Sequence, residues 1–141
     1  MIRRGDFNIK GLIQKLNQLK SNLPIFIAND VENHFLDGFR KGGGQTDAGM
    51  WRPRRGDRDS GRAILVKSGD LRADIKRREV NFKRIVVGTR NIAYAAVHNE
   101  GGRAGRGRGF TMLKREFIGK SRILESKIKF LIENELKKVK P

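Results

Sequence analysis

The residues of this chain best suited to acid–base chemistry are the consecutive side chains His98, Asn99 and Glu100, which could be joined by His34. Catalysis needs such groups held together with tuned pKa values, here beside neighbouring arginines. A His-Asn-His nuclease or a two-histidine metal site would need further metal-binding side chains at regular spacing, and the two histidines are far apart in the sequence. We therefore expect no enzymatic activity, no metal and no cofactor, with His98 as a polar residue that ends a helix.

A run of glycine and arginine follows directly and contains Arg103, Arg106 and Arg108. Flexible arginine–glycine segments bind nucleic acid through phosphate contacts and guanidinium stacking. The alternative is a solvated loop without a ligand, because no aromatic residue separates these arginines before Phe110. The three arginines are thus candidates for a DNA-facing or assembly loop.

Three aromatic residues near the glycine-rich segments are candidate interface anchors, namely Trp51, Phe110 and Phe117. Large aromatic side chains of this kind often fill a pocket on a partner. The alternative places them at the edge of the chain's own core, where each contributes about 1.5–3 kcal/mol when buried. We favour the core for Phe117 and leave Trp51 open.

The composition restricts the partner and excludes several kinds of chemistry. Thirty-two Lys and Arg residues against 15 Asp and Glu residues give a formal charge of +17. Nucleic acid is the commonest partner of such a charge, although an acidic protein or subunits of opposite local charge would also fit. The absence of cysteine excludes disulfides, thiolate zinc sites and cysteine nucleophiles. The glycines at 42–44 lack the lysine and strand of a phosphate-binding P-loop, which argues against nucleotide hydrolysis. No apolar segment of membrane-spanning length follows the start, so we expect an intracellular chain without a membrane partner.

The 141 residues are enough for a single domain, 1–141, with one hydrophobic core. Residues 1–39 form the helical N-terminal part, because apolar residues recur from Leu12 to Leu23 at helical spacing. Pro24 suits the first turn of a second helix, which predicts a break or kink at Asn22 or Leu23. Residues 40–62 are rich in glycine and arginine and are predicted to form a long exposed, flexible loop.

Residues 63–100 are predicted to form an αβ core. Ala63 to Val66 is a short apolar run typical of a buried strand, and Ser68 can cap a short helix with Leu71 and Ile75 facing inward. Residues 77–82 and 84–89 alternate or are β-branched, which predicts a hairpin. A short helix is expected over 91–98, ending at the glycines 101–102.

Residues 101–115 are predicted to form a basic Gly-rich loop, and residues 116–141 a C-terminal helix region capped by Ser121. Lys137 and Lys138 would oppose the dipole of that helix. The fold class is therefore α+β. We expect N-terminal amphipathic helices, a small antiparallel β-sheet with short helices, a C-terminal helix and long basic Gly-rich loops.

Five short motifs follow one another along the chain. They are Trp51-Arg52-Pro53, Ile64-Leu65-Val66-Lys67-Ser68-Gly69-Asp70-Leu71-Arg72, Val87-Gly88-Thr89, Tyr94-Ala95-Ala96-Val97-His98-Asn99-Glu100-Gly101-Gly102 and Arg115-Glu116-Phe117-Ile118-Gly119. In this order they resemble the motifs of the phage virion morphogenesis family, the tail-completion and neck proteins of tailed bacteriophages. The resemblance covers roughly residues 35–135, and the chain departs from the family at Glu116, where proline is usual.

The resemblance implies a non-enzymatic assembly protein that acts in tail completion and head–tail joining at the neck of the virion. It would be made in the host cytoplasm, self-associate into a homo-oligomeric ring and contact neck, connector and tail proteins, with possible nonspecific contact with packaged DNA. A closed ring uses heterologous contacts, for which protruding loops are suitable. We expect residues 42–61 and 101–109 to be disordered in the free monomer and to become ordered against a neighbour. The alternative is an independent module that binds nucleic acid without sequence preference through the same loops.

Overall fold

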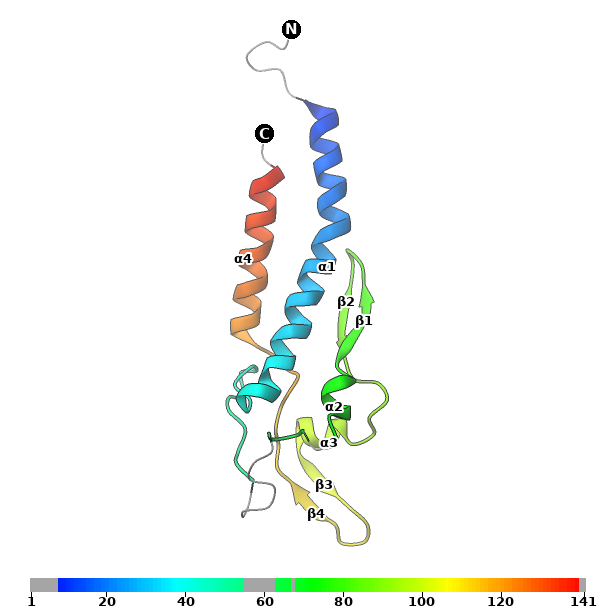
Figure 1. Cartoon of the computed structure of the whole chain (residues 1–141), viewed down its shortest axis with the longest axis vertical. Helices are drawn as coiled ribbons and strands as arrows, with labels where there is room; N and C mark the ends of the chain where they lie inside the picture. The colour runs from blue at the N-terminus through cyan, green and yellow to red at the C-terminus, as the bar shows by residue number, and fades with distance from the viewer. Residues whose placement is uncertain (1–7, 55–62, 67, 140–141) are drawn as a thin grey trace.

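The computed structural model describes residues 8–54, 63–66 and 68–139, and its α+β architecture confirms the predicted fold class. Figure 1 shows an elongated molecule in which two long helices run side by side at the end that carries both termini. One small hairpin flanks the longer helix on its other side, and a second hairpin projects at the opposite end. The elements are α1 (Ile9–Lys41), α2 (Asp70–Ala73), β1 (Lys76–Val80), β2 (Ile85–Gly88), α3 (Ala95–Glu100), β3 (Gly102–Ala104), β4 (Phe110–Met112) and α4 (Arg122–Val139).

Helix α1 is continuous from Ile9 to Lys41, so the predicted break into two helices at Asn22 or Leu23 is wrong, whereas a kink at this point stays a prediction. The helix starts at Asn8, whose side-chain oxygen accepts a hydrogen bond from the amide of Gly11 at 3.0 Å, and it runs through Pro24. A proline inside a helix removes one hydrogen bond and costs about 3 kcal/mol. Leu23 and Pro24 are both buried, and α1 packs against α4 and the β1–β2 hairpin. We attribute the continuity of the helix to this burial, which offsets the cost of the proline.

Helix α4 starts as the sequence predicts. The hydroxyl of Ser121 accepts a hydrogen bond from the amide of Leu124 at 3.2 Å, which confirms Ser121 as the cap. The same hydroxyl lies 3.2 Å from Nε2 of His34 in α1, and that nitrogen donates to the carbonyl oxygen of Gln45 at 2.7 Å. From this point α4 runs antiparallel to α1 (Figure 1). The contacts of His34 therefore place the N-terminus of α4 beside the His34 turn of α1.

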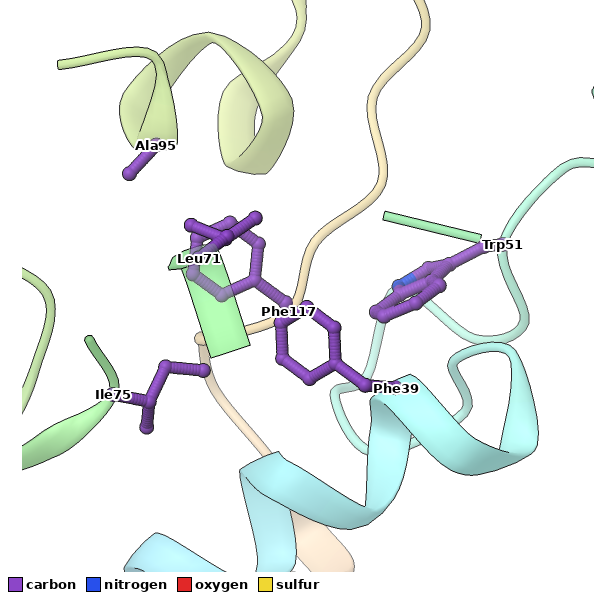
Figure 2. Packing of buried hydrophobic residues seen from close by; sticks show 6 residues of the cluster. All are labelled: Phe39, Trp51, Leu71, Ile75, Ala95 and Phe117. Atoms are coloured by element: carbon purple, nitrogen blue, oxygen red, sulfur yellow. The ribbon is translucent and has the colours of Figure 1, made fainter. Parts of the chain in front are cut away.

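The hydrophobic core joins the C-terminal part of α1, which carries Phe39, to segments distant in sequence (Figure 2). The ring of Phe39 packs against Trp51 with centroids 5.4 Å apart and against Phe117 with centroids 5.8 Å apart. Leu71 and Ile75 are each 2 % exposed, which confirms that they face inward. The buried cluster consists of Phe39, Trp51, Leu71, Ile75, Ala95 and Phe117.

The predicted strand at residues 63–66 is wrong. These residues form a turn, in which the amide of Val66 donates to the carbonyl oxygen of Ala63 at 3.2 Å and Leu65 adopts a φ of 64°. The side chains of Ile64, Leu65 and Val66 are half-buried and pack against the core. The run is apolar because it covers the core, and periodicity alone does not separate such a segment from a strand.

The predicted hairpin is confirmed as β1 and β2, which pair antiparallel from Lys76 opposite Gly88 to Val80 opposite Ile85. Its turn is closed by Asn81, whose side-chain oxygen accepts hydrogen bonds from two of the following amides. Both strands contact α1. The hairpin therefore forms the flank of α1 that α4 leaves open (Figure 1).

The base of the hairpin is held by the buried carboxylate of Asp74. It accepts hydrogen bonds from the amides of Arg90 and Asn91 at 2.8 and 2.9 Å, and from Nη2 of Arg78 at 2.8 Å. Burial alone would raise the pKa of Asp74, but these hydrogen bonds and the charge of Arg78 together lower that pKa to about 2. Asp74 is thus ionised over the physiological range and joins α2 to both ends of the hairpin.

The described part of the predicted 40–62 loop is ordered by specific contacts. Arg40 and Lys41 belong to α1, and residues 42–54 fold back through an antiparallel bridge between Gly43 and Met50. A Cβ at Gly43 would lie 2.6 Å from the amide nitrogen of Trp51, so the close approach requires glycine. The remainder of the predicted loop, residues 55–62, lies outside the described residues.

Candidate functional site

The basic Gly-rich segment forms a hairpin, where the sequence predicts an irregular loop. Strands β3 and β4 pair antiparallel, with Gly102 opposite Met112 and Ala104 opposite Phe110. We name residues 102–112 the basic arm; it projects at the end of the molecule away from both termini (Figure 1). The glycines at its tip adopt positive φ, and a Cβ at Gly109 would lie 2.3 Å from the carbonyl oxygen of Ala104. The alternating glycines therefore build a tight turn.

The basic arm presents cations without any acidic side chain of its own. Arg103, Arg106 and Arg108 are exposed, and the guanidinium of Arg103 donates a hydrogen bond to the carbonyl oxygen of Arg108. No Asp or Glu occurs between Gly101 and Arg115 in the sequence. Uncompensated positive charge on a narrow projection attracts phosphate groups or acidic side chains.

The structure separates the three aromatic candidates. Trp51 is 6 % exposed and Phe117 is 3 % exposed, and both belong to the buried cluster. The indole N–H of Trp51 also donates to the carbonyl oxygen of Glu116 at 2.9 Å. Phe110, in contrast, is 56 % exposed and lies at the start of β4. Of the three, Phe110 is the one whose ring is on the surface, beside the arginines of the arm.

The arm is held at its root by α3 and by the segment that precedes α4. Helix α3 lies a few residues later than predicted and ends at Gly101, which has a φ of 75°. The amide of Arg115 donates to the carbonyl oxygen of His98 at 2.8 Å. The side-chain oxygen of Asn99 accepts from the amides of Phe117 and Ile118 at 2.9 and 3.0 Å. These bonds join the two sequence motifs that flank the arm.

A pocket of about 440 Å³ lies at this root and brings three distant motifs together. Its deepest charged group is Arg115, which is 8 % exposed. The guanidinium of Arg115 donates from Nε to the carbonyl oxygen of Arg52 at 3.0 Å and from Nη2 to that of Pro53 at 3.3 Å. Burial, assisted by the charge of Arg54, lowers the pKa of Arg115. The described lining residues are Arg54, Leu65, Val66, Ser68, Gly69, Asp70, Leu71, Tyr94, His98 and Arg115.

Ser68 lies at the same pocket, but the prediction that it caps α2 is wrong, because Gly69 occupies the N-cap position and no described side chain caps that helix. Its hydroxyl accepts from the amide of Asp70 at 3.3 Å and donates to the carboxylate of Asp70 at 2.8 Å. Leu71 then points into the core. The Ser68–Asp70 pair thus forms the polar edge of the pocket.

The side chains of His98, Asn99, Glu100 and His34 are not assembled into one site. His98 is half-buried in α3 beside the ring of Tyr94, and burial together with the positive charge of Arg115 lowers the pKa of His98. Its Nδ1 has no hydrogen-bond partner among the described residues. His34 instead bonds Gln45 and Ser121, and Asn99 bonds backbone amides. Within residues 8–54, 63–66 and 68–139, no three His, Cys, Asp or Glu side chains are grouped to hold a metal ion.

Arg115 is the site residue that sequence reasoning did not single out. It closes a run of exposed basic residues, and the sequence gives no sign that its side chain turns inward. The only signal was its place in the last of the five motifs. None of the described helices is long and apolar enough to cross a membrane.

Comparison with known proteins gives one match. The model of the phage virion morphogenesis family matches residues 14–137. No curated protein and no solved structure matches the chain. The matched residues include most of both long helices, and all of the buried cluster, the described pocket lining and the basic arm. The chain therefore belongs to the phage virion morphogenesis family and has a role in phage virion assembly.

Proposed function

We propose that the chain is a non-enzymatic neck protein that completes the tail and joins it to the head, acting as a homo-oligomeric ring at the head–tail junction. The family supports assembly of the virion, and the basic arm is the observation that carries the finer assignment. In a ring, the arms would repeat around a central passage through which packaged DNA runs. Arg103, Arg106 and Arg108 would then hold phosphates without reading the base sequence.

The position of the arm supports this proposal. It lies at one end of an elongated subunit, while both long helices lie at the other end (Figure 1). Its root is bonded to α3 and to residues 52 and 53, so the arginines are presented from an ordered base. Phosphate contact therefore requires little ordering of the arm itself, which lowers the entropic cost of binding.

The first experiment tests the biological role. Electron microscopy of a lysate from phage that lack the protein is expected to show filled heads beside separate tails. Normal particles would refute head–tail joining. Complementation with the unaltered gene product should restore joined particles, which serves as the control.

The second experiment tests the arm. A triple variant with Arg103, Arg106 and Arg108 changed to Ser should bind DNA more weakly. Its affinity should also depend less on salt, by about 0.9 log unit per log unit of salt for each phosphate that the variant no longer binds. A matched variant changes the exposed helix residues Lys10, Lys15 and Lys129 to Gln and removes the same charge. Equal effects of the two variants, or unchanged DNA retention in particles that carry the arm variant, would assign the arm to protein contacts.

The alternative function is an independent module that binds nucleic acid outside any virion, and the same arm would serve it. Light scattering at moderate salt, with and without DNA, separates the two functions. An oligomer, or dependence on a virion partner, favours the neck assignment. A monomer that binds DNA tightly and leaves phage assembly unchanged when deleted favours the module.

A further inference from the structure

Helix α4 exposes large apolar side chains on the face that points away from α1, which we name the outer face of α4. Ile123 and Phe130 are 57 % and 65 % exposed and lie seven residues apart, which is close to two helical turns. Leu124, one position further around the helix, is 7 % exposed, and α4 packs against α1. Among the described residues, the outer face of α4 is thus an apolar stripe that no other element covers, and it lies beside the stripe of α4 that packs against α1.

A second exposed apolar surface lies on the other side of α1. A groove of about 950 Å³ runs between α1 and the tip of the β1–β2 hairpin, and we name it the hairpin groove. Ile25 and Phe82 are 45 % and 60 % exposed in it, and Nζ of Lys20 lies 5.8 Å from the centroid of the Phe82 ring. Its lining residues are Lys20, Ser21, Pro24, Ile25, Val80, Asn81, Phe82 and Lys83.

The two surfaces are on opposite sides of the subunit and at the same height. Figure 1 shows α4 and the β1–β2 hairpin flanking α1 from opposite sides. The contact of His34 with Ser121 sets a common level for the antiparallel helices. Phe130 is nine residues after Ser121 in α4, and Ile25 is nine residues before His34 in α1. Because both helices rise about 1.5 Å per residue, Phe130 and Ile25 lie at closely similar heights along the helix pair.

This arrangement suits a ring of identical subunits. Rotation about an axis parallel to the long helices superposes each subunit on its neighbour. It leaves the position of every residue along that axis unchanged. Phe130 on one side of a subunit is then level with Ile25 on the facing side of the next. Two different surfaces on opposite sides are what a closed, heterologous contact requires, whereas a two-fold dimer would pair one surface with itself.

One acidic side chain of α4 lies level with a lysine of the hairpin groove, on a stretch of helix that also carries exposed Lys129 and Lys137. Glu133 is exposed, one turn beyond Phe130 on α4, and forms no ion pair with any residue in the described ranges. Glu133 is twelve residues after Ser121, and Asn22 is twelve residues before His34, so these two residues lie at similar heights along the helix pair. Asn22 is two residues from Lys20, which lines the hairpin groove. A chain with a charge of +17 repels its own copies, so an acidic side chain facing lysines is valuable at a contact between subunits.

We propose that the outer face of α4 docks into the hairpin groove of a second copy of this chain, with Phe130 against Ile25 and Phe82 and with Glu133 facing Lys20. This inference rests on the ring of the proposed function and assigns the surfaces that close it. The apolar contact supplies the driving force, and the ion pair sets the register between neighbours.

The absence of natural cysteine allows a direct test by disulfide formation. The double variant Ile25→Cys with Phe130→Cys places one thiol on each surface. Residue 130 lies on the outer face of α4 and residue 25 in the hairpin groove on the other side of α1, so we expect no disulfide within one subunit. Mild oxidation of the assembled protein is expected to give a ladder of covalent oligomers on a denaturing gel, ending at the ring size. A matched pair, Ile25→Cys with the exposed Phe110→Cys on the arm, should give no ladder.

The outcomes separate this inference from the ring itself. An oligomer of normal size without the ladder would overturn the proposed surfaces and leave the ring standing. A monomer both in solution and in virions would overturn the ring as well. If Phe130→Asp blocks incorporation into virions while the cysteine pair still gives no ladder, the outer face of α4 binds another virion protein and the proposal is wrong.

A charge reversal provides an independent readout. Glu133→Lys is expected to reduce assembly at low salt, since it adds a cation opposite Lys20. Lys20→Glu in the same chain should restore assembly, whereas Lys15→Glu, on an exposed position of the same helix, should not. Equal rescue by both changes would show that net charge alone controls assembly and would contradict the specific pair.

Discussion

Nε of Arg115 donates a hydrogen bond to the carbonyl oxygen of Arg52 at 3.0 Å, joining residues that are 63 positions apart. The bond connects the base of the basic arm to the segment that carries Trp51 into the core. The amide of Arg115 bonds His98 at the same point, so α3 is fixed as well. The buried guanidinium of Arg115 is therefore one of the contacts that fix the orientation of the arm relative to the core.

Replacement of this guanidinium is expected to loosen the arm. Arg115→Lys keeps the charge but loses the planar fork that reaches both Arg52 and Pro53. We expect a loss of about 1–3 kcal/mol in the free energy of unfolding, measured by urea denaturation, and faster hydrogen exchange in β3 and β4. Arg106→Lys at the exposed tip is the control, with an expected change within about 0.5 kcal/mol. Equal effects would show that the buried contacts of Arg115 are unimportant.

Two phenylalanines test the division between core and surface. Phe117→Ala should lower the free energy of unfolding by about 3–5 kcal/mol, because the side chain of Phe117 is 3 % exposed and packs against Phe39. Phe110→Ala should change stability by no more than about 0.5 kcal/mol, since the Phe110 ring is 56 % exposed. Fluorescence of Trp51, the sole tryptophan, reports unfolding in both variants. A large cost for Phe110→Ala would mean that its ring is packed in solution.

The carboxylate of Asp74 predicts a pH dependence with a definite sign. Its pKa is lowered from 3.8 to about 2 in the folded state, so the folded chain binds fewer protons than the unfolded chain in this interval. The stabilisation is fully present above about pH 5, well above the unfolded pKa, and is lost as the pH falls through the folded pKa of about 2. Asp74→Asn should therefore lower the denaturation midpoint most at neutral pH, and the two midpoints should converge near pH 2.

Asp37→Asn is the matched control for this measurement. Its carboxylate pairs with Arg40 and Lys41 on an exposed part of α1, where ion pairs contribute little. We expect the denaturation midpoint of Asp37→Asn to differ little from that of the unaltered protein at every pH. If the difference in denaturation midpoint between the unaltered protein and Asp74→Asn stays constant down to pH 2, the stabilisation does not come from ionisation of the Asp74 carboxylate.

Substitution of two glycines of the arm by alanine distinguishes the effect of backbone strain from the effect of a steric clash. Gly107 and Gly109 both have positive φ, of 64° and 60°. A Cβ at Gly107 would meet nothing within 4 Å, whereas one at Gly109 would lie 2.3 Å from the carbonyl oxygen of Ala104. Gly109→Ala should therefore raise hydrogen-exchange rates in β3 and β4 much more than Gly107→Ala. Equal rates in the two variants would show that the turn rearranges freely.

Several elements could be predicted because their signals are local. Alternation and β-branching over residues 77–89 specify a hairpin whichever partner it meets, and Ser121 caps α4 through neighbouring amides. Leu71 lies on a single turn of helix and is buried in the core, as its apolar side chain predicts. The order of the five motifs likewise predicts the family, because motif order is a property of the chain alone.

Other features were decided by contacts between distant residues. Pro24 remains inside α1, and residues 63–66 form a turn over the core, because burial against other elements outweighs local preference. Glycine spacing in the arm suggested disorder, yet pairing of β3 with β4 converts the same glycines into a turn.

The candidate site shows the same division. The sequence by itself determined the charge of the chain, the basic run and the absence of cysteine. Only the tertiary structure decided that Trp51 and Phe117 are buried, that Phe110 is exposed and that Arg115 turns inward. The reason is physical: composition fixes which groups a chain carries, whereas burial depends on which segments fold against each other.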